Sequence, residues 1–345
     1  MSRHTLIRGA LEALALAQAP RWLPAAPDAA GFVVTLHHVG PTQRSTFQPN
    51  ALLSVTSEFL DDFLGRFIRS GWRFVSVDEI VRSGAEVDFD SRRIAVTLDD
   101  GYRDNLQHAW PVFRRHSVPF TIYVCPGFCD RTAELWWEAL ERIIAAADAV
   151  PVPGETGAAA LATRSPREKL KAFRRWTDWL TADADEAEQR RAIRALAEGN
   201  GLDLAALAEE LVMDWDQIRT ITADPLASIG AHTMTHPALA RLPPQAAFRE
   251  MSDSADRIEM ETGRRPTSIA FPYGYKAAAS SREAGLAEQA GFAASFTTRP
   301  GYIAREGSRH GLPRVSLNGL FQNIRHVETL LVPGLWKVKE RIRPN

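Results

Sequence analysis

The sequence has few cysteines, no long apolar run and almost no net charge. Its two cysteines, Cys125 and Cys129, are too few for a disulfide framework and lack the second pair that a structural zinc site needs, so we expect two small buried residues near a strand end. With 41 basic and 42 acidic residues, the chain has no global positive field of the kind that drives nucleic-acid binding. No stretch approaches the roughly 18 consecutive apolar residues of a membrane span. We therefore expect no nucleic-acid partner and no spanning helix.

Residues 1–30 are predicted to form an N-terminal helical segment. Basic residues precede a mostly apolar stretch over 11–19, but Glu12 and Gln18 interrupt it and leave an apolar core shorter than that of a secretory signal. Residues 6–16 are typical of a helix with one apolar face, which we expect to pack on the rest of the protein. Contact with a membrane surface is the alternative. We therefore expect a cytoplasmic protein, with peripheral membrane association left open.

Short β-rich runs alternate with helical patterns through most of the chain, which is typical of an α/β fold. A helix is expected over residues 58–70, where apolar residues recur at three- and four-residue spacing before Gly71. The expected strands cover residues 32–36, 74–77, 94–98, 120–124, 227–229, 268–271 and 293–296. This is about the number that one large α/β barrel needs, and 345 residues suit such a barrel.

Residues 130–224 interrupt this alternation. They are rich in Ala, Glu and Arg at helical spacing, with no convincing strand, and residues 150–160 are rich in Pro, Gly and Ala, as in an exposed loop. We therefore expect one catalytic domain over residues 31–345, a barrel of about seven strands with a helical insertion at 130–224.

A strand that ends in two carboxylates is the sharpest local feature. Residues 94–98 place apolar side chains on one face and run directly into Asp99, Asp100 and Gly101. Neighbouring carboxylates converge on one site only where a strand ends and the backbone turns, and Gly101 permits that turn. Active sites of parallel α/β folds lie at these strand ends. Taken alone, the motif could equally be an ordinary turn.

Two histidines four residues apart, His232 and His236, follow the strand expected over residues 227–229. On one face of a helical turn they can bind one metal, although Pro237 requires that turn to be short or irregular. With Asp100 they supply three nitrogen and oxygen ligands and leave a position for water, as in catalytic zinc sites. Asp99 beside that water could act as the general base.

These motifs resemble those of the polysaccharide deacetylase family, also called the NodB-homology or carbohydrate esterase 4 family. Residues 97–101 are similar to its Thr-Phe-Asp-Asp-Gly motif with Leu98 in place of Phe, residues 232–236 to its His-Ser/Thr-x-x-His motif, and residues 270–274 to its third motif. The resemblance covers roughly residues 32–316 apart from the insertion. It implies a distorted (β/α) barrel.

The resemblance also implies the roles of the site residues. Asp99 would be the base, and Asp100, His232 and His236 the metal ligands. Two histidines and a carboxylate accept Zn²⁺, Co²⁺, Ni²⁺ or Mn²⁺, and zinc is the default. The backbone N–H of Tyr273 would help to hold the oxyanion.

The catalytic acid is the point where the chain departs from many family members. Their Leu-x-His motif near the C-terminus has no counterpart here, since the later histidines, His310 and His326, lack the right neighbours. Residues 35–41 are instead similar to a segment of a permuted branch of the family, in which the acid histidine precedes the Asp-Asp motif. This resemblance implies His37 as the acid, with His38 as the alternative.

Arg314 lies in a Leu-Pro-Arg segment that resembles the one closing this branch. An arginine there could pair with Asp99 and keep it ionised, although a surface arginine is equally plausible. Trp136 and Trp137 of the insertion could stack on a sugar ring, but core packing is the preferred interpretation of both.

The resemblance implies a hydrolase that removes the N-acetyl group of an amino sugar in a poly- or oligosaccharide, so the expected partner is a carbohydrate. A deformylase, a cyclic amidase or an O-acetyl esterase could use the same site. A non-catalytic carbohydrate-binding protein is the alternative from another class. The complete set of Asp99, Asp100, His232 and His236 argues against it.

Overall fold

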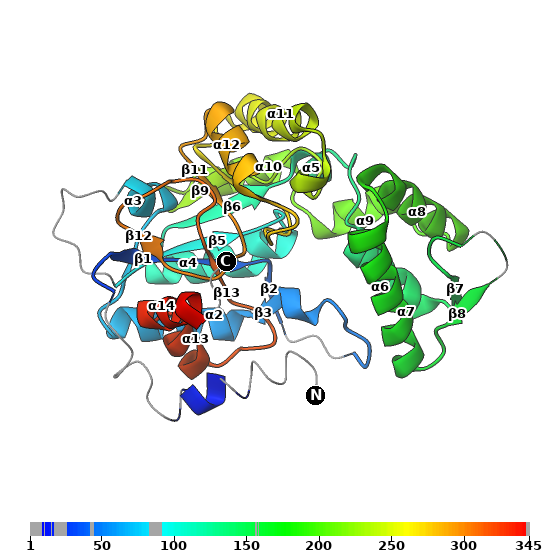
Figure 1. Cartoon of the computed structure of the whole chain (residues 1–345), viewed down its shortest axis with the longest axis horizontal. Coiled ribbons are helices and arrows are strands. Elements are labelled where there is room, and N and C mark those ends of the chain that lie inside the picture. Colours follow the sequence, from blue (N-terminus) through cyan, green and yellow to red (C-terminus); the bar gives the residue numbers. More distant parts are fainter. Residues whose placement is uncertain are drawn as a thin grey trace.

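A curled parallel sheet forms the centre of the molecule (Figure 1). The computed structural model describes residues 9, 11–14, 16, 26–41, 45–82, 92–155, 157 and 159–342. Six strands pair in parallel, in the order β1 (Ala29–Leu36), β5 (Arg93–Leu98), β6 (Phe120–Val124), β9 (Ala227–Ala231), β10 (Ser268–Ala270) and β11 (Ala294–Phe296). Two short strands join this sheet, β4 (Arg73–Phe74) beside the start of β5 and β12 (Ile303–Ala304) antiparallel to β1.

A C-terminal segment closes the sheet into a barrel. Leu312 forms a parallel bridge with Phe296 of β11, and β13 (Val315–Ser316) pairs in parallel with β1. The Leu312 N–H donates to Ser295 O at 2.8 Å. The six parallel strands and this segment together give seven strand positions around the core, which confirms the predicted distorted barrel of about seven strands.

The predicted strands are confirmed except at one position. Five of the six parallel strands are buried along their whole length, and β9 is buried at its last two residues. Strands buried on both faces appear in a sequence as short apolar runs. The strand predicted over residues 74–77 is wrong beyond Phe74, because α3 (Val77–Arg82) begins at Val77. Ser76 Oγ accepts the Glu79 N–H at 3.1 Å, which stabilises the start of this helix.

Helices surround the sheet (Figure 1). The helix predicted over residues 58–70 is confirmed as α2 (Ser57–Arg69), with Thr56 accepting the Phe59 N–H at its start. Near α2 lie α4 (Trp110–His116) and α13 (Ile324–Leu330), and α14 (Pro333–Ile342) follows α13. In contrast, α10 (Trp215–Thr222), α11 (Pro244–Thr262) and α12 (Ser281–Gln289) lie beside β9 to β11.

Most of the insertion stands at one side of the barrel, coloured green in Figure 1, whereas its last helix, α10, lies beside β9. Its further helices are α6 (Trp136–Ala146), α7 (Pro166–Asp178), α8 (Glu186–Gly199) and α9 (Leu204–Leu211). The predicted absence of strands is wrong, because β7 (Ala149–Pro151) and β8 (Ala160–Ala162) form an antiparallel pair. Val150 is buried, and Pro151 O accepts the Trp176 indole N–H at 2.9 Å. Packing on α7 thus orders part of a segment whose Pro, Gly and Ala content suggests a loop.

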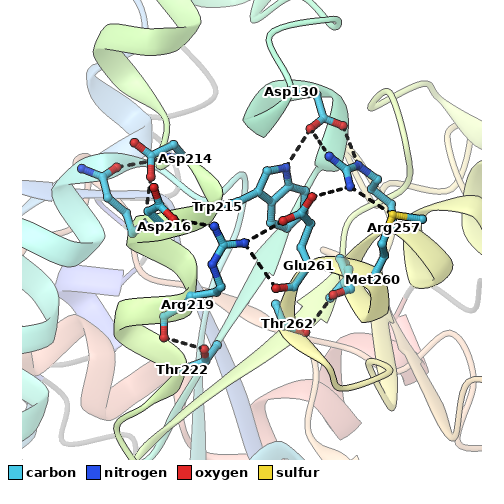
Figure 2. Close-up of polar contacts among 12 residues, drawn as sticks. Asp130, Asp214, Trp215, Asp216, Arg219, Thr222, Arg257, Met260, Glu261 and Thr262 are labelled. Atoms are coloured by element: carbon cyan, nitrogen blue, oxygen red, sulfur yellow. Dashed lines mark hydrogen bonds and ion pairs between the residues drawn. The ribbon is translucent and has the colours of Figure 1, made fainter.

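A chain of ion pairs links the outer helices to the start of the insertion (Figure 2). Asp130 accepts from the Arg257 guanidinium at 2.8 Å and from the Trp215 indole N–H at 2.7 Å. Glu261 in turn accepts from Arg257 and, at 2.6 Å, from Arg219. The network therefore joins α10 and α11 to the residue that follows α5 (Pro126–Cys129).

Both cysteines, at or next to the ends of α5, are buried free thiols, as expected. Burial raises the pKa of Cys129 to about 12. Cys125 Sγ lies 3.3 Å from Met234 O, which suits a buried thiol donor.

The described part of the N-terminal segment packs on the rest of the protein. Residues 11–14 are helical, Leu11 is buried, and the Glu12 carboxylate contacts His326 Nε2 of α13 at 2.7 Å. Residues 6–8, 10 and 15 of the predicted helix lie outside the described residues. Among the residues described, no helix is long and apolar enough to cross a bilayer. The cytoplasmic location stays a prediction.

Candidate metal centre

Asp100, His232 and His236 meet at the carboxyl ends of β5 and β9, the two strands that flank β6. Asp100 follows β5, and both histidines lie on the loop after β9. Asp100 Oδ1 lies 3.4 Å from His232 Nε2 and 3.3 Å from His236 Nε2. One ligand atom from each of the three buried residues lies within 4.8 Å of the others. The two distant motifs therefore form one cluster.

The donor set fits a divalent metal ion. His232 Nδ1 lies 2.7 Å from Ala270 O, which can only accept, so the ring donates through Nδ1 and presents Nε2 to Asp100. Asp100 Oδ1 is buried without a hydrogen-bond donor among the described residues. Two ligands of a tetrahedral zinc ion lie about 3.3 Å apart, since each bond is roughly 2.0 Å long. A cation between these atoms would satisfy the carboxylate oxygen and both ring nitrogens.

Left-handed backbone conformations occur at and beside the three clustered residues and orient their side chains. Asp100 has φ 71° and is followed by Gly101 at 73°, while Thr233 and His236 have φ 61° and 62°. Such conformations cost non-glycine residues of order ~1–3 kcal/mol each and cluster at functional sites. The predicted helical turn at the histidines is thus not formed, in keeping with Pro237. The His236 N–H donates instead to Thr233 Oγ1 at 3.0 Å.

His236 lies in an aromatic environment. Its ring centroid is 4.9 Å from Trp137, 5.0 Å from Tyr273 and 5.5 Å from Phe128. Burial lowers the pKa of His236 although Asp100 opposes this shift. The imidazole is therefore held neutral, which is the form that binds metals.

Asp99 pairs with Arg314 inside the barrel. Arg314 Nη1 and Nη2 donate to Oδ1 and Oδ2 of Asp99, each at 2.7 Å, and the two residues are 0% and 1% exposed. Arg314 also donates to Thr297 O and Thr97 Oγ1. Burial raises the pKa of Asp99, but the Arg314 guanidinium and other nearby cations outweigh it, so the pKa lies below its usual range. The predicted pairing is thus present, and a surface position for Arg314 is wrong.

The two neighbouring histidines after β1 differ in their partners. His38 contacts Asp104 through Nδ1 at 2.6 Å and Glu138 through Nε2 at 3.3 Å, and it stacks on Tyr102 with a centroid distance of 3.5 Å. Burial lowers the pKa of His38, yet the two carboxylates outweigh it and raise the pKa to about 10. Both nitrogens of this imidazolium are therefore engaged away from the metal ligands.

His37 has no hydrogen-bond partner for its ring among the residues that the structure describes. Burial lowers the pKa of His37, while the negative charges of Asp100 and Asp99 raise it. The His37 ring is therefore close enough to both carboxylates to interact with their charges. The Asn105 side chain donates to His37 O at 2.8 Å and fixes the backbone there. Of the two histidines, His37 is thus the one whose ring nitrogens contact no carboxylate within the described residues.

Tyr273 occupies the third motif in a strained conformation. Its φ is 60° and that of Gly274 is 61°, and Thr298 Oγ1 donates to Tyr273 O at 2.6 Å. Its phenol accepts the Trp136 indole N–H at 2.8 Å. Within the described residues the Tyr273 backbone N–H has no acceptor, so it is free to donate to a ligand.

The insertion supplies one wall of the site. Trp136 and Trp137 of α6 are each 7% exposed, and Trp137 donates to Tyr102 Oη at 2.8 Å. The expected core packing of both residues is confirmed. The sequence analysis did not predict Asp104, Asn105 or Glu138 as residues of the site. The one feature that could have indicated them is their position shortly after the Asp-Asp-Gly motif and the Trp136–Trp137 pair.

Part of the chain matches a known protein-family model. The polysaccharide deacetylase family model matches residues 176–294, which include His232, His236 and Tyr273. Among curated protein sequences, none matches the chain.

Solved structures share the fold. The Streptococcus pyogenes deacetylase PplD in complex with acetate is 16% identical with a TM-score of 0.56, covering 88% of this chain and 97% of that one. IcaB from Ammonifex degensii is 16% identical with a TM-score of 0.53 and coverages of 88% and 97%. A de-N-acetylase from Aggregatibacter actinomycetemcomitans is 13% identical with a TM-score of 0.55 and coverages of 87% and 99%.

The matched segment contains two of the three motifs, and the structure brings the third, Asp99 and Asp100, to the same strand ends. Over most of the chain, the likeness to the solved structures is one of fold. The chain is therefore similar to the polysaccharide deacetylase family model over residues 176–294, and it shares the barrel fold of solved deacetylases.

Proposed function

We propose that the protein is a metal-dependent deacetylase that hydrolyses the N-acetyl group of an amino sugar in a poly- or oligosaccharide. The observation that carries this proposal is the position of the Asp99–Arg314 pair next to the Asp100, His232 and His236 cluster. A similar structure named as a de-N-acetylase, and another determined with acetate, support the choice of an N-acetyl substrate.

Asp100, His232 and His236 would hold the ion, with zinc as the default. A bound divalent ion would acidify water and polarise the acetyl carbonyl. Asp99 is kept ionised by Arg314 and accepts the proton of the attacking water. The Tyr273 N–H stabilises the negative charge that develops on the carbonyl oxygen.

His37 completes the reaction. The departing amine is a poor leaving group until it is protonated, and His37 is the histidine whose ring nitrogens are not engaged by carboxylates. Proton donation from His37 would release a free amino sugar and acetate.

The test measures acetate release from N-acetylglucosamine oligomers by zinc-reconstituted protein. Asp99→Asn and His37→Ala are each expected to lower kcat by about 10²–10⁴-fold, the usual contribution of a general base or acid. Asp216→Asn, whose side chain is 90% exposed on α10, is the matched control and should retain full activity. Undiminished acetate release by either site variant would remove that residue from the mechanism.

A substrate panel separates the alternatives. Formylated and O-acetylated sugars, assayed beside N-acetylated ones, would reveal a deformylase or an esterase by a higher kcat/KM. Stoichiometric metal without turnover of any of them would contradict the deacetylase proposal.

A further inference from the structure

Thr235, the residue before the ligand His236, is held from two sides. Glu250 of α11 accepts the Thr235 N–H at 2.8 Å and contacts the hydroxyl at 2.7 Å. Arg190 of α8 donates through Nη2 to Thr235 O at 2.7 Å and to Thr235 Oγ1 at 2.8 Å. The polar backbone and side-chain atoms of Thr235 therefore all have partners, and α8 belongs to the insertion rather than to the barrel.

These contacts bear directly on the orientation of His236. The Thr235 carbonyl lies in the same peptide plane as the His236 nitrogen, so the Arg190 contact fixes one side of that plane. On the other side, the His236 N–H donates to Thr233 Oγ1 at 3.0 Å. Because Thr233 and His236 both adopt positive φ, the loop needs external contacts to keep this shape.

Arg190 is itself oriented by a partner. Its Nη1 donates to Glu134 Oε2 at 3.1 Å, and the Glu134 side chain is only 9% exposed. Arg194, one turn further along α8, also donates to Glu134, at 2.5 Å. Of Arg190, Arg194 and Glu134, Arg190 is the one that hydrogen-bonds to the histidine loop in the described part of the chain.

We propose that Arg190 is a positioning residue for the metal centre, so that the insertion holds His236 in its ligand orientation through the contact of Arg190 with Thr235. The inference rests on the proposed function only in taking Asp100, His232 and His236 as metal ligands. Partners behind a metal ligand commonly change metal affinity by about 10–100-fold when they are removed. The arginine fork can contact Thr235 and Glu134 together, whereas lysine offers one charged nitrogen.

The experiment titrates Co²⁺ into the metal-free full chain and follows the visible absorption of the bound ion. Arg190→Gln is compared with Arg194→Gln, which loses a contact to the same Glu134 but none to the loop. We expect Arg190→Gln to raise the Kd for Co²⁺ by about 10–100-fold and to change the visible bands. Arg194→Gln should keep the wild-type Kd and bands, and thermal unfolding of both metal-free variants checks that they are folded.

Arg190→Lys provides a milder variant, with Arg194→Lys as its control. The Kd of Arg190→Lys for Co²⁺ is expected to lie between those of wild type and Arg190→Gln. If Arg190→Gln does not fold, the comparison of Arg190→Lys with Arg194→Lys tests the proposal. Equal Kd values for the variants at 190 and 194 would overturn the proposal. A wild-type chain that binds no Co²⁺ would overturn both this inference and the metal dependence. Binding without acetate release, together with the Arg190 effect, would overturn the proposed substrate while supporting the positioning role.

Discussion

Asp99 and Arg314, 215 positions apart in the chain, form a buried two-point ion pair. Arg314→Leu would leave the Asp99 carboxylate buried without a counter-charge, so we expect a loss of about 3–5 kcal/mol in the free energy of unfolding. Urea unfolding measures this loss. Arg265→Leu, which removes exposed pairs with Asp256 and Glu259, should cost less than about 1 kcal/mol. Equal effects of the two variants would contradict a structural role for the buried pair.

His38 should make the stability depend on pH. Its pKa of about 10 in the folded protein exceeds the usual 6.5, so its stabilising charge is fully present below about pH 6.5 and is lost as the pH rises toward about 10. The stability difference between wild type and His38→Gln should therefore be largest near pH 6.5, at most about 5 kcal/mol, and should shrink steadily toward pH 10. A difference that stays constant over this range, in urea unfolding at each pH, would be inconsistent with the contacts to Asp104 and Glu138.

Gly274 is expected to tolerate no side chain. Its φ is 61°, and a Cβ atom there would lie 2.3 Å from the Thr298 nitrogen. Gly274→Ala should lower the free energy of unfolding by more than about 1 kcal/mol and reduce kcat, because the loop carrying Tyr273 must move. Gly285→Ala within α12 is the control, since a Cβ atom there meets nothing within 4 Å and should stabilise the helix by up to about 1 kcal/mol. The same change in stability for both variants would refute this prediction.

Asp130 should matter for stability but not for turnover. Asp130→Ala removes the acceptor shared by Trp215 and Arg257 (Figure 2), which we expect to cost about 1–3 kcal/mol. Asp216→Ala, at an exposed position of the same network, should cost less than about 1 kcal/mol. Chemical unfolding and acetate release, measured on the same preparations, distinguish the two effects. A large loss of kcat in folded Asp130→Ala would show that the network reaches the active site.

Much of the barrel could be predicted because its strands are buried on both faces. β5 and β6 therefore appear as short runs that are mostly apolar, with Thr97 and Thr121 as the polar residues inside them. β13 has only two residues, too few for any periodicity, so the hydrophobic pattern did not predict the strand that closes the barrel. The pair of β7 and β8 was missed because tertiary packing of Val150 outweighs the loop-like composition around it.

The cluster of Asp100, His232 and His236 could be predicted because a carboxylate and two imidazoles are typical ligands of a catalytic metal. The residues that contact the histidine loop could not be predicted. Arg190 is one of many arginines in a helical segment, and only the packing of α8 on the histidine loop distinguishes it from Arg194. Likewise, nothing in the adjacent His37 and His38 shows which ring the carboxylates of Asp104 and Glu138 engage.

The segment that completes the barrel also carries Arg314, the partner of Asp99, so closure of the sheet and formation of the buried ion pair depend on the same residues. A nascent polypeptide that has emerged from the ribosome only as far as β11 has an open sheet edge and an Asp99 without its arginine. Both defects end when Leu312 to Val315 dock between β11 and β1. A chain that ends before this segment would therefore have neither the closed barrel nor the counter-charge of Asp99.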